Sequence, residues 1–481
     1  MICIPISANT NEEMIALLAK AAHEPGDLVE LRFDSLTEPP DVETLLAAAR
    51  QPVIAACRAR REGGGYDGSV DARRDILARA VRAGAAFVDA EPADIVYLAP
   101  NKRDTALIAS FHDFSGTPDN LASRVADLEK LPCDWVKFVV TAHRPADNIK
   151  VFDLMAACYK PCIGVAMGEE GLMTRVLGMV YGSRIAFGSL DPSHETAAGQ
   201  PTARDLFHIY RVKELTRHTK VYGLLGNPVA QSRGYRLHNR AFAQTGHDGV
   251  YIPFRAESAT DFLDTVAPYL NLRGLSVTIP HKPAAIAWAK IRSKNSTRIG
   301  AANTLTRTPE GWRADNTDMP AIFESIKAVT DAGGMNLTGA SALLLGAGGT
   351  TRAAGLALSL LGCKVTVAAR DPEKAFRVAS QMDWDVESMQ DALPADWTVV
   401  ANTTPVGMYP NIEDTVFPAQ YWKPGMLAFD AVHNPRQTRF LRDAAEAGAL
   451  IVDGVDMFIR QGAEQFRMWT GQEMPKLISL L

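Results

Sequence analysis

Short apolar runs alternate with longer segments of helical spacing over the first 215 or so residues of the chain. We predict strands at ICIPI (2–6), LVELRFD (28–34), PVIAACR (52–58), FVDAE (87–91), ALIASFHD (106–113), WVKFVV (135–140), CIGVAM (162–167) and RIAFGS (184–189). Helix-like segments lie between most of them, among them 11–24, 72–84, 119–131, 146–158 and 170–181. Alternating strands and helices indicate a parallel sheet. Eight such units within about 200 residues favour a (β/α)₈ barrel over an open sheet.

A second pattern begins after the charged stretch RVKELTRHTK (211–220). It starts with the apolar run VYGLLG (221–226) and continues as α/β alternation to about residue 320. In ALLLGAGGTTRAAGLALSLLG (342–362) an apolar strand meets a glycine turn and then a helix. Further strands are predicted at VTVAAR (365–370), WTVVAN (397–402), MLAFDAV (426–432) and ALIVDG (449–454). This order is typical of a Rossmann-like nucleotide-binding domain.

The two patterns together predict three domains in an α/β protein of 481 residues, a length too great for one hydrophobic core. We expect a barrel over 1–216 and an α/β lobe over 220–325 that is completed by 455–481. The nucleotide-binding domain is expected over 326–454.

The composition narrows the class of protein further. A net charge of −5, without a run of lysine and arginine, argues against a nucleic-acid partner. The start MICIPIS does not resemble a signal peptide, and no apolar run is long enough to cross a bilayer, so we expect no membrane partner. Of the six cysteines only Cys158 and Cys162 lie close together in the sequence. No second pair and no histidine cluster accompanies them to complete a zinc site. We therefore expect reduced thiols, no metal and a cytoplasmic location.

Charged and imidazole side chains occur inside or at the ends of the predicted barrel strands: Glu30, Arg32, Asp34, Arg58, Glu91, His112 and Lys137. Side chains alternate along a strand, so Glu30, Arg32 and Asp34 are expected to share one face. A charge inside a barrel is costly unless it is paired or functional, and the carboxyl ends of barrel strands form active sites. A lysine held away from water is more often a free amine that can attack a carbonyl. A nearby histidine can then move protons at neutral pH, and arginines can bind a carboxylate.

At these residues the segment 1–215 resembles type I 3-dehydroquinate dehydratase. The motifs are ELRFD (30–34), CRARREGG (57–64), DAE (89–91), SFHDFSGTP (110–118), DWVKFVVTA (134–142), MGEEGLMTR (167–175) and TAAGQPT (196–202). The resemblance implies that Lys137 forms an imine with the ketone of 3-dehydroquinate. It also implies that His112 removes the adjacent proton and assists the loss of water, with Glu91 orienting its imidazole. The substrate-binding residues that it implies are Glu30, Arg32, Arg58, Arg175, Thr196 (where the family usually has Ser) and Gln200.

The glycine turn of the second half indicates a pyrophosphate site, which backbone N–H groups at a helix N-terminus can provide. Its glycines are Gly346, Gly348 and Gly349, and Thr351 stands at the third glycine position of the usual dinucleotide fingerprint. The next strand ends at Arg370, which suits the extra phosphate of NADP, whereas an acid there would suit NAD. Asp371 follows directly, and Arg352 adds positive charge nearby. We predict NADP as the cofactor.

The other lobe contributes the segments SVTIPHK (276–282), GAANTL (300–305) and DNTDM (315–319). Lys282 and Asp318 could relay a proton at an alcohol carbon, and Thr278 and Asn303 could bind a polyhydroxylated ring. Taken singly, each could instead be a solvated charge or a helix cap.

From about residue 220 to its end the chain resembles shikimate dehydrogenase. The motifs occur in the family's order: GNPVAQS (226–232), GLSVTIPHK (274–282), GAANTL, DNTD, LGAGGTTRA (345–353), ANTTPVGM (401–408), FDAVHNP (429–435) and GVDMFIRQGAEQF (454–466). The resemblance implies that Lys282 and Asp318 form the catalytic pair for reduction of 3-dehydroshikimate to shikimate. It further implies substrate ligands at Ser232, Thr278, Asn303 and Gln461, and a cofactor contact at Thr403.

Three residues depart from this pattern: Gly234 replaces a second serine, Ser276 replaces an asparagine, and His433 stands where tyrosine is frequent. Because Gly234 leaves room near the carboxylate, the second half could instead oxidise quinate, with NAD. Another alternative is a regulatory or binding protein that has lost catalysis, against which the intact Lys137, His112, Lys282 and Asp318 argue. Since the product of the first predicted reaction is the substrate of the second, we expect a bifunctional enzyme of the shikimate pathway. Its oligomeric state stays open.

Overall fold

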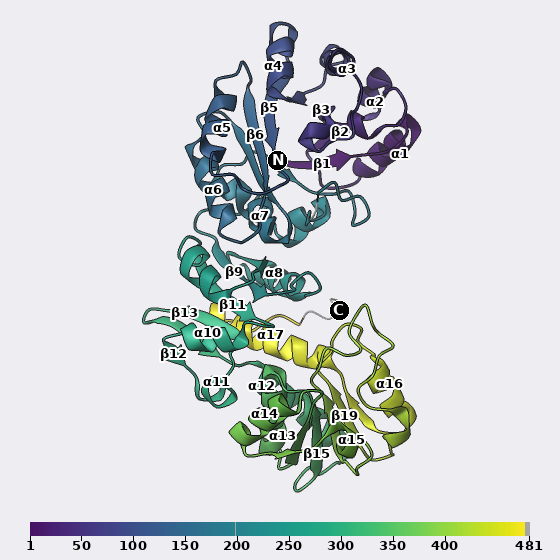
Figure 1. Ribbon diagram of the computed structural model, residues 1–481, viewed down its shortest axis with the longest axis vertical. Helices are drawn as coiled ribbons and strands as arrows, with labels where there is room; N and C mark the ends of the chain where they lie inside the picture. Colours follow the sequence, from purple (N-terminus) through teal and green to yellow (C-terminus); the bar gives the residue numbers. More distant parts are fainter. Residues whose placement is uncertain (198, 477–481) are drawn as a thin grey trace. The chain divides into compact units, whose positions relative to one another are not determined.

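The computed structural model describes residues 1–197 and 199–476 (Figure 1). Ala198, within the predicted motif TAAGQPT, and residues 477–481, within the segment expected to complete the lobe, lie outside the described residues. Contacts within the chain divide it into two compact units, Met1–Leu272 and Arg273–Leu481. The first unit holds the predicted barrel together with the start of the second half.

Eight parallel strands in the order β7-β6-β5-β4-β3-β2-β1-β8 form the barrel. They are β1 (Ile2–Ile6), β2 (Leu28–Arg32), β3 (Val53–Ala56), β4 (Phe87–Ala90), β5 (Ala106–His112), β6 (Trp135–Thr141), β7 (Cys162–Met167) and β8 (Ala186–Phe187). A parallel bridge between Cys162 and Ser183 adjoins the seam between β7 and β8, so the sheet is nearly closed. The predicted (β/α)₈ architecture is confirmed.

Helices connect the barrel strands, and Figure 1 shows them on the outside. They are α1 (Asn11–Ala21), α2 (Val42–Ala48), α3 (Val70–Arg82), α4 (Pro92–Leu98), α5 (Leu121–Glu129), α6 (Asp147–Ala157) and α7 (Leu172–Tyr181). Ser69 caps α3 by accepting a hydrogen bond from the Ala72 N–H, and Thr10 caps α1 in the same way through Glu13. Buried side chains from strands around the barrel form its apolar core: Cys3, Leu28, Ile54, Ile108, Ile163 and Phe187.

Several strands are shorter than predicted, and the shortening of β2 changes the position of a charged side chain. β2 ends at Arg32, and Phe33–Ser35 form a 3₁₀ turn, so Asp34 does not continue the strand face of Glu30. The cause is local, because the Asp34 carboxylate accepts two hydrogen bonds from the Arg32 guanidinium (2.9 and 2.7 Å) and one from the Gly65 N–H (3.0 Å).

The first unit continues past the barrel with β9 (Lys220–Gly226), α8 (Gly234–Thr245) and β10 (Gly249–Arg255). β9 and β10 pair in parallel along their whole length. The short helix α9 (Ala259–Asp261) follows them.

The second unit contains a six-stranded parallel sheet in the order β17-β16-β15-β18-β19-β20. Its strands are β15 (Ser341–Leu345), β16 (Lys364–Ala368), β17 (Asp385–Val386), β18 (Val399–Asn402), β19 (Leu427–Asp430) and β20 (Leu450–Val452). The strand order reverses between β15 and β18, the place where doubly wound sheets bind nucleotides. The helices that belong to this sheet are α13 (Gly349–Leu360), α14 (Pro372–Met382), α15 (Met389–Ala392) and α16 (Arg439–Glu446). The predicted Rossmann-like domain is confirmed.

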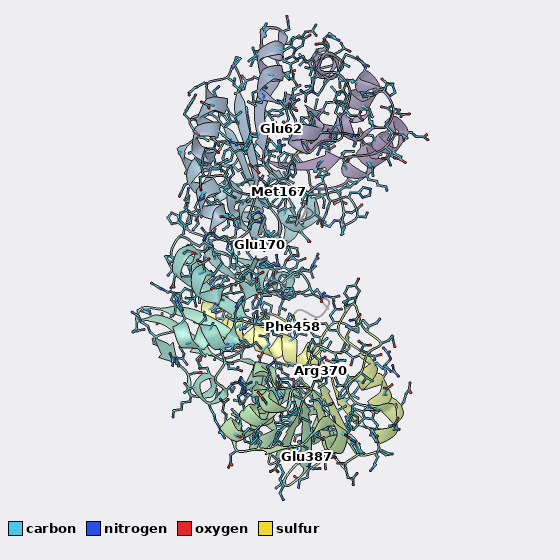
Figure 2. The ribbon with its side chains drawn as sticks, in the orientation of Figure 1. Glu62, Met167, Glu170, Arg370, Glu387 and Phe458 are labelled. Carbon is cyan, nitrogen blue, oxygen red and sulfur yellow. The ribbon has the colours of Figure 1, made fainter. Side chains whose placement is uncertain are left out.

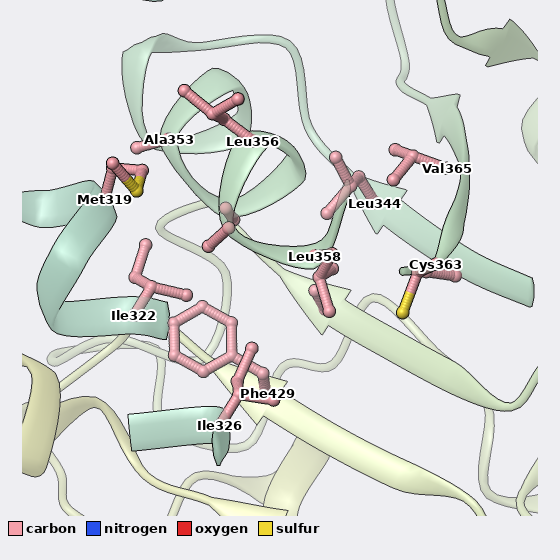
Figure 3. Packing of buried hydrophobic residues seen from close by; sticks show 14 of the residues in the cluster. Met319, Ile322, Ile326, Leu344, Ala353, Leu356, Leu358, Cys363, Val365 and Phe429 are labelled. Carbon is pink, nitrogen blue, oxygen red and sulfur yellow. The ribbon is translucent and has the colours of Figure 1, made fainter. Parts of the chain in front are cut away.

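A tight apolar core joins this sheet to α12 (Asp318–Gly333). Figure 3 shows Ile322 and Ile326 of α12 against Phe429 of β19, and the same cluster contains Leu344 of β15 and Leu358 of α13. All five side chains are fully buried.

The other strands and α-helices of the second unit are β11 (Leu272–Val277, whose first residue still belongs to the first unit), α10 (Lys282–Trp288), β12 (Ile291–Arg292), α11 (Lys294–Ile299), β13 (Thr304–Thr308), β14 (Gly311–Asp315) and α17 (Gly454–Thr470). β13 pairs antiparallel with both β11 and β14, and β12 pairs in parallel with β14. Among the residues that the structure describes, no helix is both long and apolar enough to cross a bilayer.

Candidate active sites

The buried amine of Lys137 lies at the centre of the first site. Lys137 is only 5% exposed on β6, and its Nζ donates to Glu30 Oε1 (3.1 Å) and Asp89 Oδ2 (2.6 Å). Nζ also lies 4.4 Å from the centre of the Phe187 ring. Arg58 donates to the same oxygen of Asp89 (3.3 Å). Burial alone would raise the pKa of Asp89, but the charges of Lys137 and Arg58 outweigh burial and lower it. Asp89 is a site residue that sequence reasoning missed, although the motif DAE contains it.

The imidazole of His112 is buried at the end of β5. Burial lowers its pKa well below the usual value, and the charges of Arg58 and Lys137 add to the effect. His112 is therefore neutral near pH 7 and can accept a proton. Two carboxylates lie near it: the charge of Asp89 partly offsets the lowering of its pKa, and Glu62 Oε2 lies 3.5 Å from Nδ1 and accepts the His112 backbone N–H (3.1 Å). Burial raises the pKa of Glu62. Figure 2 labels Glu62, which ends the 3₁₀ turn after β3.

Glu91 does not form the expected contact with His112. Its carboxylate binds the guanidinium groups of Arg61 and Arg73 and accepts the backbone N–H of Ala59 (3.3 Å). Arg73 is 2% exposed and also pairs with Asp94. Glu91 directly precedes α4, and its carboxylate contacts these arginines rather than His112, so its role in orienting the imidazole stays a prediction. The irregular loop after β3 carries Glu62, and no periodicity shows which way a loop side chain points.

These contacts predict different effects for two conservative substitutions. Glu62→Gln should lower the dehydration rate at least about tenfold, because a neutral amide cannot stabilise the imidazolium that forms during proton transfer. Glu91→Gln should leave the rate near that of the parent but lower the free energy of unfolding by about 2 kcal/mol, because Arg73 loses a charged partner. Steady-state assays and denaturant unfolding of both variants measure the two effects. A larger loss of rate in Glu91→Gln than in Glu62→Gln would contradict the assignment.

Arg175, on α7, has the features of an anion-binding residue. It is 4% exposed, and its Nε and Nη2 have no hydrogen-bond partner among the described residues. Burial lowers its pKa to about 10, so it remains charged at neutral pH. A buried guanidinium with unbonded N–H groups is suited to a carboxylate ligand. Arg32 differs, since its guanidinium is already bonded to Asp34.

Gln200 and Thr196 are held together on the loop that follows β8. The Gln200 side chain is buried, and its Oε1 accepts hydrogen bonds from the Thr196 N–H (3.1 Å) and hydroxyl (3.0 Å). Gly199 between them has a positive φ of 71° and packs against Gly168, one residue past β7. A cavity of about 440 Å³ opens nearby, lined in part by Arg32, Ser193 and Thr196.

The second site is built on a lysine–aspartate pair. Lys282 and Asp318 are the first residues of α10 and α12, and their Nζ and Oδ2 atoms are 2.6 Å apart. The side chains are 14% and 7% exposed. The Asn303 side-chain amide donates to the other oxygen of Asp318 (2.8 Å), and its side-chain oxygen Oδ1 accepts the Thr317 N–H (2.8 Å). The pair is thus fixed in one geometry, with the Lys282 ammonium partly open to solvent.

Gln465 on α17 is a second residue that sequence reasoning missed. It is 1% exposed, accepts a hydrogen bond from Ser276 (2.7 Å) and donates to the backbone oxygen of Asn303 (3.2 Å). Ser276, which departs from the family pattern, therefore still has a polar partner. The sequence signal for Gln465 was its position four residues, or one helical turn, after Gln461 in the motif GVDMFIRQGAEQF.

The remaining predicted substrate ligands are more exposed. Thr278 follows β11 and is half-buried. Gln461 lies on α17, where its amide donates to the Phe458 oxygen (3.0 Å). Figure 2 labels Phe458, whose ring stacks on His433 with centroids 4.7 Å apart. Ser232 belongs to the first unit, and its hydroxyl accepts the Gly234 N–H (3.2 Å).

The glycine turn has the conformation expected of a nucleotide loop. Gly346 has a φ of 130°, and a Cβ there would lie 2.6 Å from the Thr403 hydroxyl. Thr403 donates to the Leu345 oxygen (2.8 Å) and hydrogen-bonds with Thr351. The Thr351 hydroxyl also accepts the Gly348 N–H (2.9 Å), so the threonine at the third glycine position braces the loop. Helix α13 begins at Gly349, which points its N-terminus at this turn.

Two arginines near the turn have different environments. Arg370 follows β16, is exposed and has no ion pair among the described residues; Figure 2 labels it. Asp371 beside it caps α14, accepting the Lys374 N–H (3.1 Å), and it pairs with the Lys374 ammonium (3.0 Å). The Asp371 carboxylate, next to Arg370, is therefore already bound by Lys374. Arg352 is half-buried and donates to the Ile299 oxygen (3.1 Å), and burial lowers its pKa.

Comparison with known proteins finds relatives of both halves. Residues 2–217 match the family Type I 3-dehydroquinase, 224–305 match the shikimate dehydrogenase substrate binding domain, and 454–477 match the shikimate 5'-dehydrogenase C-terminal domain. A chloroplastic bifunctional 3-dehydroquinate dehydratase/shikimate dehydrogenase of Arabidopsis thaliana is 34% identical over 500 residues, covering 99% of this chain and 83% of that protein. A shikimate dehydrogenase (NADP(+)) of Anaeromyxobacter dehalogenans is 38% identical, covering 54% of this chain and 95% of that protein.

A solved structure is also similar to the second half. Shikimate 5-dehydrogenase from Thermus thermophilus, in complex with NADP(H) and shikimate, is 33% identical with a TM-score of 0.48, covering 53% of this chain and 95% of that one. The barrel with its buried lysine and the nucleotide-binding sheet with its glycine turn define a fusion of a lyase with an oxidoreductase. The chain belongs to the family of bifunctional 3-dehydroquinate dehydratases/shikimate dehydrogenases.

Proposed function

We propose that the barrel dehydrates 3-dehydroquinate to 3-dehydroshikimate and that the second half reduces this product to shikimate with NADPH. The observation that carries the proposal is a relative with both activities in its name that aligns with 99% of the chain. The lysine that each reaction requires is present in each half, buried in the barrel and paired with Asp318 in the other site. The domain boundaries expected from the sequence, 1–216, 220–325 with 455–481, and 326–454, are part of this proposal.

In the barrel, the Lys137 amine attacks the substrate ketone, and loss of water gives the imine. His112 removes a proton from the adjacent carbon and returns it to the departing hydroxyl, which leaves as water. Glu62 stabilises the charged imidazole, the role that was expected of Glu91. Hydrolysis of the imine then releases the product and regenerates the lysine. The imine accepts electrons from the carbanion, which is why a covalent lysine lowers the barrier.

Substrate binding in the barrel is assigned to groups around Lys137. Arg175 binds the carboxylate, since its N–H groups are buried and unbonded. Arg58 and Glu30, which contact the Lys137–Asp89 cluster, bind hydroxyl groups together with Arg32. Gln200 and Thr196 close over the substrate from the loop after β8.

In the second half, Lys282 and Asp318 deliver the proton to the carbonyl oxygen of 3-dehydroshikimate. Bound NADPH supplies the hydride. The turn at Gly346, Gly348 and Gly349, with Thr403 and Arg352, would hold its pyrophosphate region, and Arg370 its extra phosphate. Ser232, Thr278, Asn303 and Gln461 bind the carboxylate and hydroxyls of the ring.

The cofactor assignment leads to a prediction for Arg370. Arg370→Ala should raise KM for NADPH about tenfold, the effect of losing one charge-assisted hydrogen bond. KM for NADH should stay unchanged, because NADH lacks the phosphate. Initial rates at varied cofactor concentration with 3-dehydroshikimate measure both values. Equal increases for the two cofactors would contradict a phosphate contact.

The test of the whole proposal is NADPH oxidation by the purified full-length chain supplied with 3-dehydroquinate alone. The expected result is steady oxidation, because the first site must make the substrate of the second. Oxidation with 3-dehydroshikimate but not with 3-dehydroquinate would overturn the assignment of the barrel. The reverse reaction, with quinate and NAD beside shikimate and NADP, tests the alternative raised by Gly234, and the relatives named above favour shikimate.

We further propose a cytoplasmic location, on the ground that all six cysteines are free thiols. Free thiols are typical of reducing compartments. One relative is chloroplastic, so a plastid location is the alternative. Fluorescence microscopy of the tagged chain distinguishes a cytoplasmic from a plastid location.

A further inference from the structure

Within the first unit, the segment that follows the last barrel strand contacts the start of α8. A π-helical turn, Asp205–Ile209, carries Asp205. Its Oδ2 accepts hydrogen bonds from Arg236 Nη2 (3.0 Å) and the Tyr235 hydroxyl (3.4 Å). Arg236 Nε donates in turn to the Tyr235 hydroxyl (2.9 Å). The Tyr235 ring stacks on Tyr210, with centroids 5.6 Å apart and planes at 11°. These four side chains form a closed contact, which we call the Asp205 clamp.

The clamp is more buried than an ordinary surface ion pair. The Asp205 side chain is 15% exposed and that of Arg236 is 39% exposed, while Tyr210 is 3% exposed. The adjacent residue, Arg204, also forms an ion pair, with Glu24, but its side chain is 66% exposed. Exposed pairs contribute little because solvent screens them, whereas a shielded pair backed by an aromatic stack restricts both partners. The clamp is therefore expected to hold its partners in one position.

What the clamp holds is the first turn of α8. Tyr235 and Arg236 are the second and third residues of that helix, which begins at Gly234 and whose N-cap residue makes no side-chain capping bond. Ser232 supplies the local fixation instead, because its hydroxyl accepts the Gly234 N–H (3.2 Å) and its own N–H donates to Val229 (3.0 Å). Any movement of this first turn would therefore move the Ser232 hydroxyl.

The other side of the clamp is continuous with the loop of the first site. The Asp205 N–H donates to the Thr202 hydroxyl (3.0 Å), and Pro201 accepts the Ser189 N–H (2.9 Å). Gln200, buried and bonded to Thr196, directly precedes these residues. Asp205 thus stands between the Gln200 loop, whose backbone is fixed to the barrel, and the helix start that follows Ser232.

We infer that Asp205 is a positioning residue of the dehydrogenase reaction: through Arg236 and Tyr235 it anchors the first turn of α8 to the barrel and so fixes the Ser232 hydroxyl for the substrate carboxylate. The inference rests on the proposed role of Ser232 as a substrate ligand. A ligand group fixed before binding costs less to order when the substrate arrives, so its loss weakens substrate binding. Proton delivery is the task of Lys282 and Asp318, which the clamp does not include.

The test is steady-state kinetics of the full-length Asp205→Ala variant. KM for 3-dehydroshikimate should rise about five- to twentyfold, the range expected when a charge-assisted hydrogen bond is lost. The dehydrogenase kcat, KM for NADPH and the dehydratase kcat/KM should each stay within about twofold of the parent. The matched control is Arg204→Ala, which removes the neighbouring ion pair and should change none of these values. The exchange Asp205→Arg with Arg236→Asp should restore much of the lost affinity, because it forms the ion pair again in the opposite sense; the rise in KM without a change in kcat is the result that a purely structural role would not predict.

The outcomes separate this inference from the proposed function. If Ser232→Ala raises KM for 3-dehydroshikimate but Asp205→Ala does not, the clamp is not a positioning device and the proposed function stands. If Ser232→Ala leaves KM unchanged, the role of Ser232 is wrong and the inference fails with it. Equal losses of both activities in Asp205→Ala would also overturn the inference. Should Asp205→Ala fail to fold, Tyr235→Phe removes one hydroxyl only; a KM rise of about two- to threefold supports the clamp, and an unchanged KM overturns it.

Discussion

Lys137→Ala is expected to lower NADPH oxidation on 3-dehydroquinate by at least about 10⁴-fold, while reduction of added 3-dehydroshikimate proceeds at the parental rate. The loss is large because no neighbouring group can replace the amine as a covalent electron sink. Asp89 and Glu30 accept hydrogen bonds from the Lys137 ammonium, but they are carboxylates and cannot form an imine. The same assay with each substrate in turn separates the two sites, because only the first substrate requires the barrel.

Chemical trapping tests the covalent step directly. Sodium borohydride added during turnover reduces an imine to a stable amine, so the parent should gain the mass of the reduced ligand on the peptide that contains Lys137. Lys137→Ala should gain no such mass. The matched control is Lys130→Ala at the end of α5, whose side chain is 73% exposed, and it should be trapped and active like the parent. A trapped adduct on any other lysine of the parent would contradict the assignment.

The barrel and its lysine could be predicted because both depend on local patterns. Strands β1 and β7 begin and end where the apolar runs do, and Lys137 lies within an apolar strand, where a charge has few structural explanations. The parallel barrel then accounts for the contact between Glu30 and Lys137, whereas Asp89, which also binds Lys137, was not singled out from the sequence. The shorter β2 was not predictable from alternation, since a side-chain pair between Arg32 and Asp34 ended it.

The partner of His112 could not be predicted in the same way. Glu91 ends a strand, so its position suggested the site, but buried Arg73 on α3 takes its carboxylate. Glu62 lies in a loop, and its contact with His112 spans 50 residues of sequence. In the second half, the sequence left open whether Asp371 binds the ribose of NAD. The structure shows that its side chain caps α14. Which partner a charged side chain binds depends on which of several candidates lies nearest in space, and the sequence does not give these distances.

Single substitutions of the pair in the second site are expected to have the other large effect. Lys282→Met and Asp318→Asn should each lower the rate of 3-dehydroshikimate reduction by about 10²- to 10⁴-fold, the range for loss of a general acid or base. Dehydration should be unaffected, so either variant supplied with 3-dehydroquinate should accumulate 3-dehydroshikimate, which its conjugated double bond makes visible in the ultraviolet. The matched control is Lys327→Met, which removes an exposed lysine of α12 that pairs with Asp331 on the same helix.

The double variant tells whether the two residues act as one unit. Lys282 Nζ and Asp318 Oδ2 are 2.6 Å apart, and Asn303 donates to the other oxygen of Asp318, so we expect the two side chains to deliver the proton together. The combined substitution should therefore cost little more than the worse single one, rather than the product of both losses. Measured rates of the parent, the two single variants and the double variant complete the cycle. Full additivity would mean that Lys282 and Asp318 serve separate steps, and a proton relay between them would then have to be abandoned.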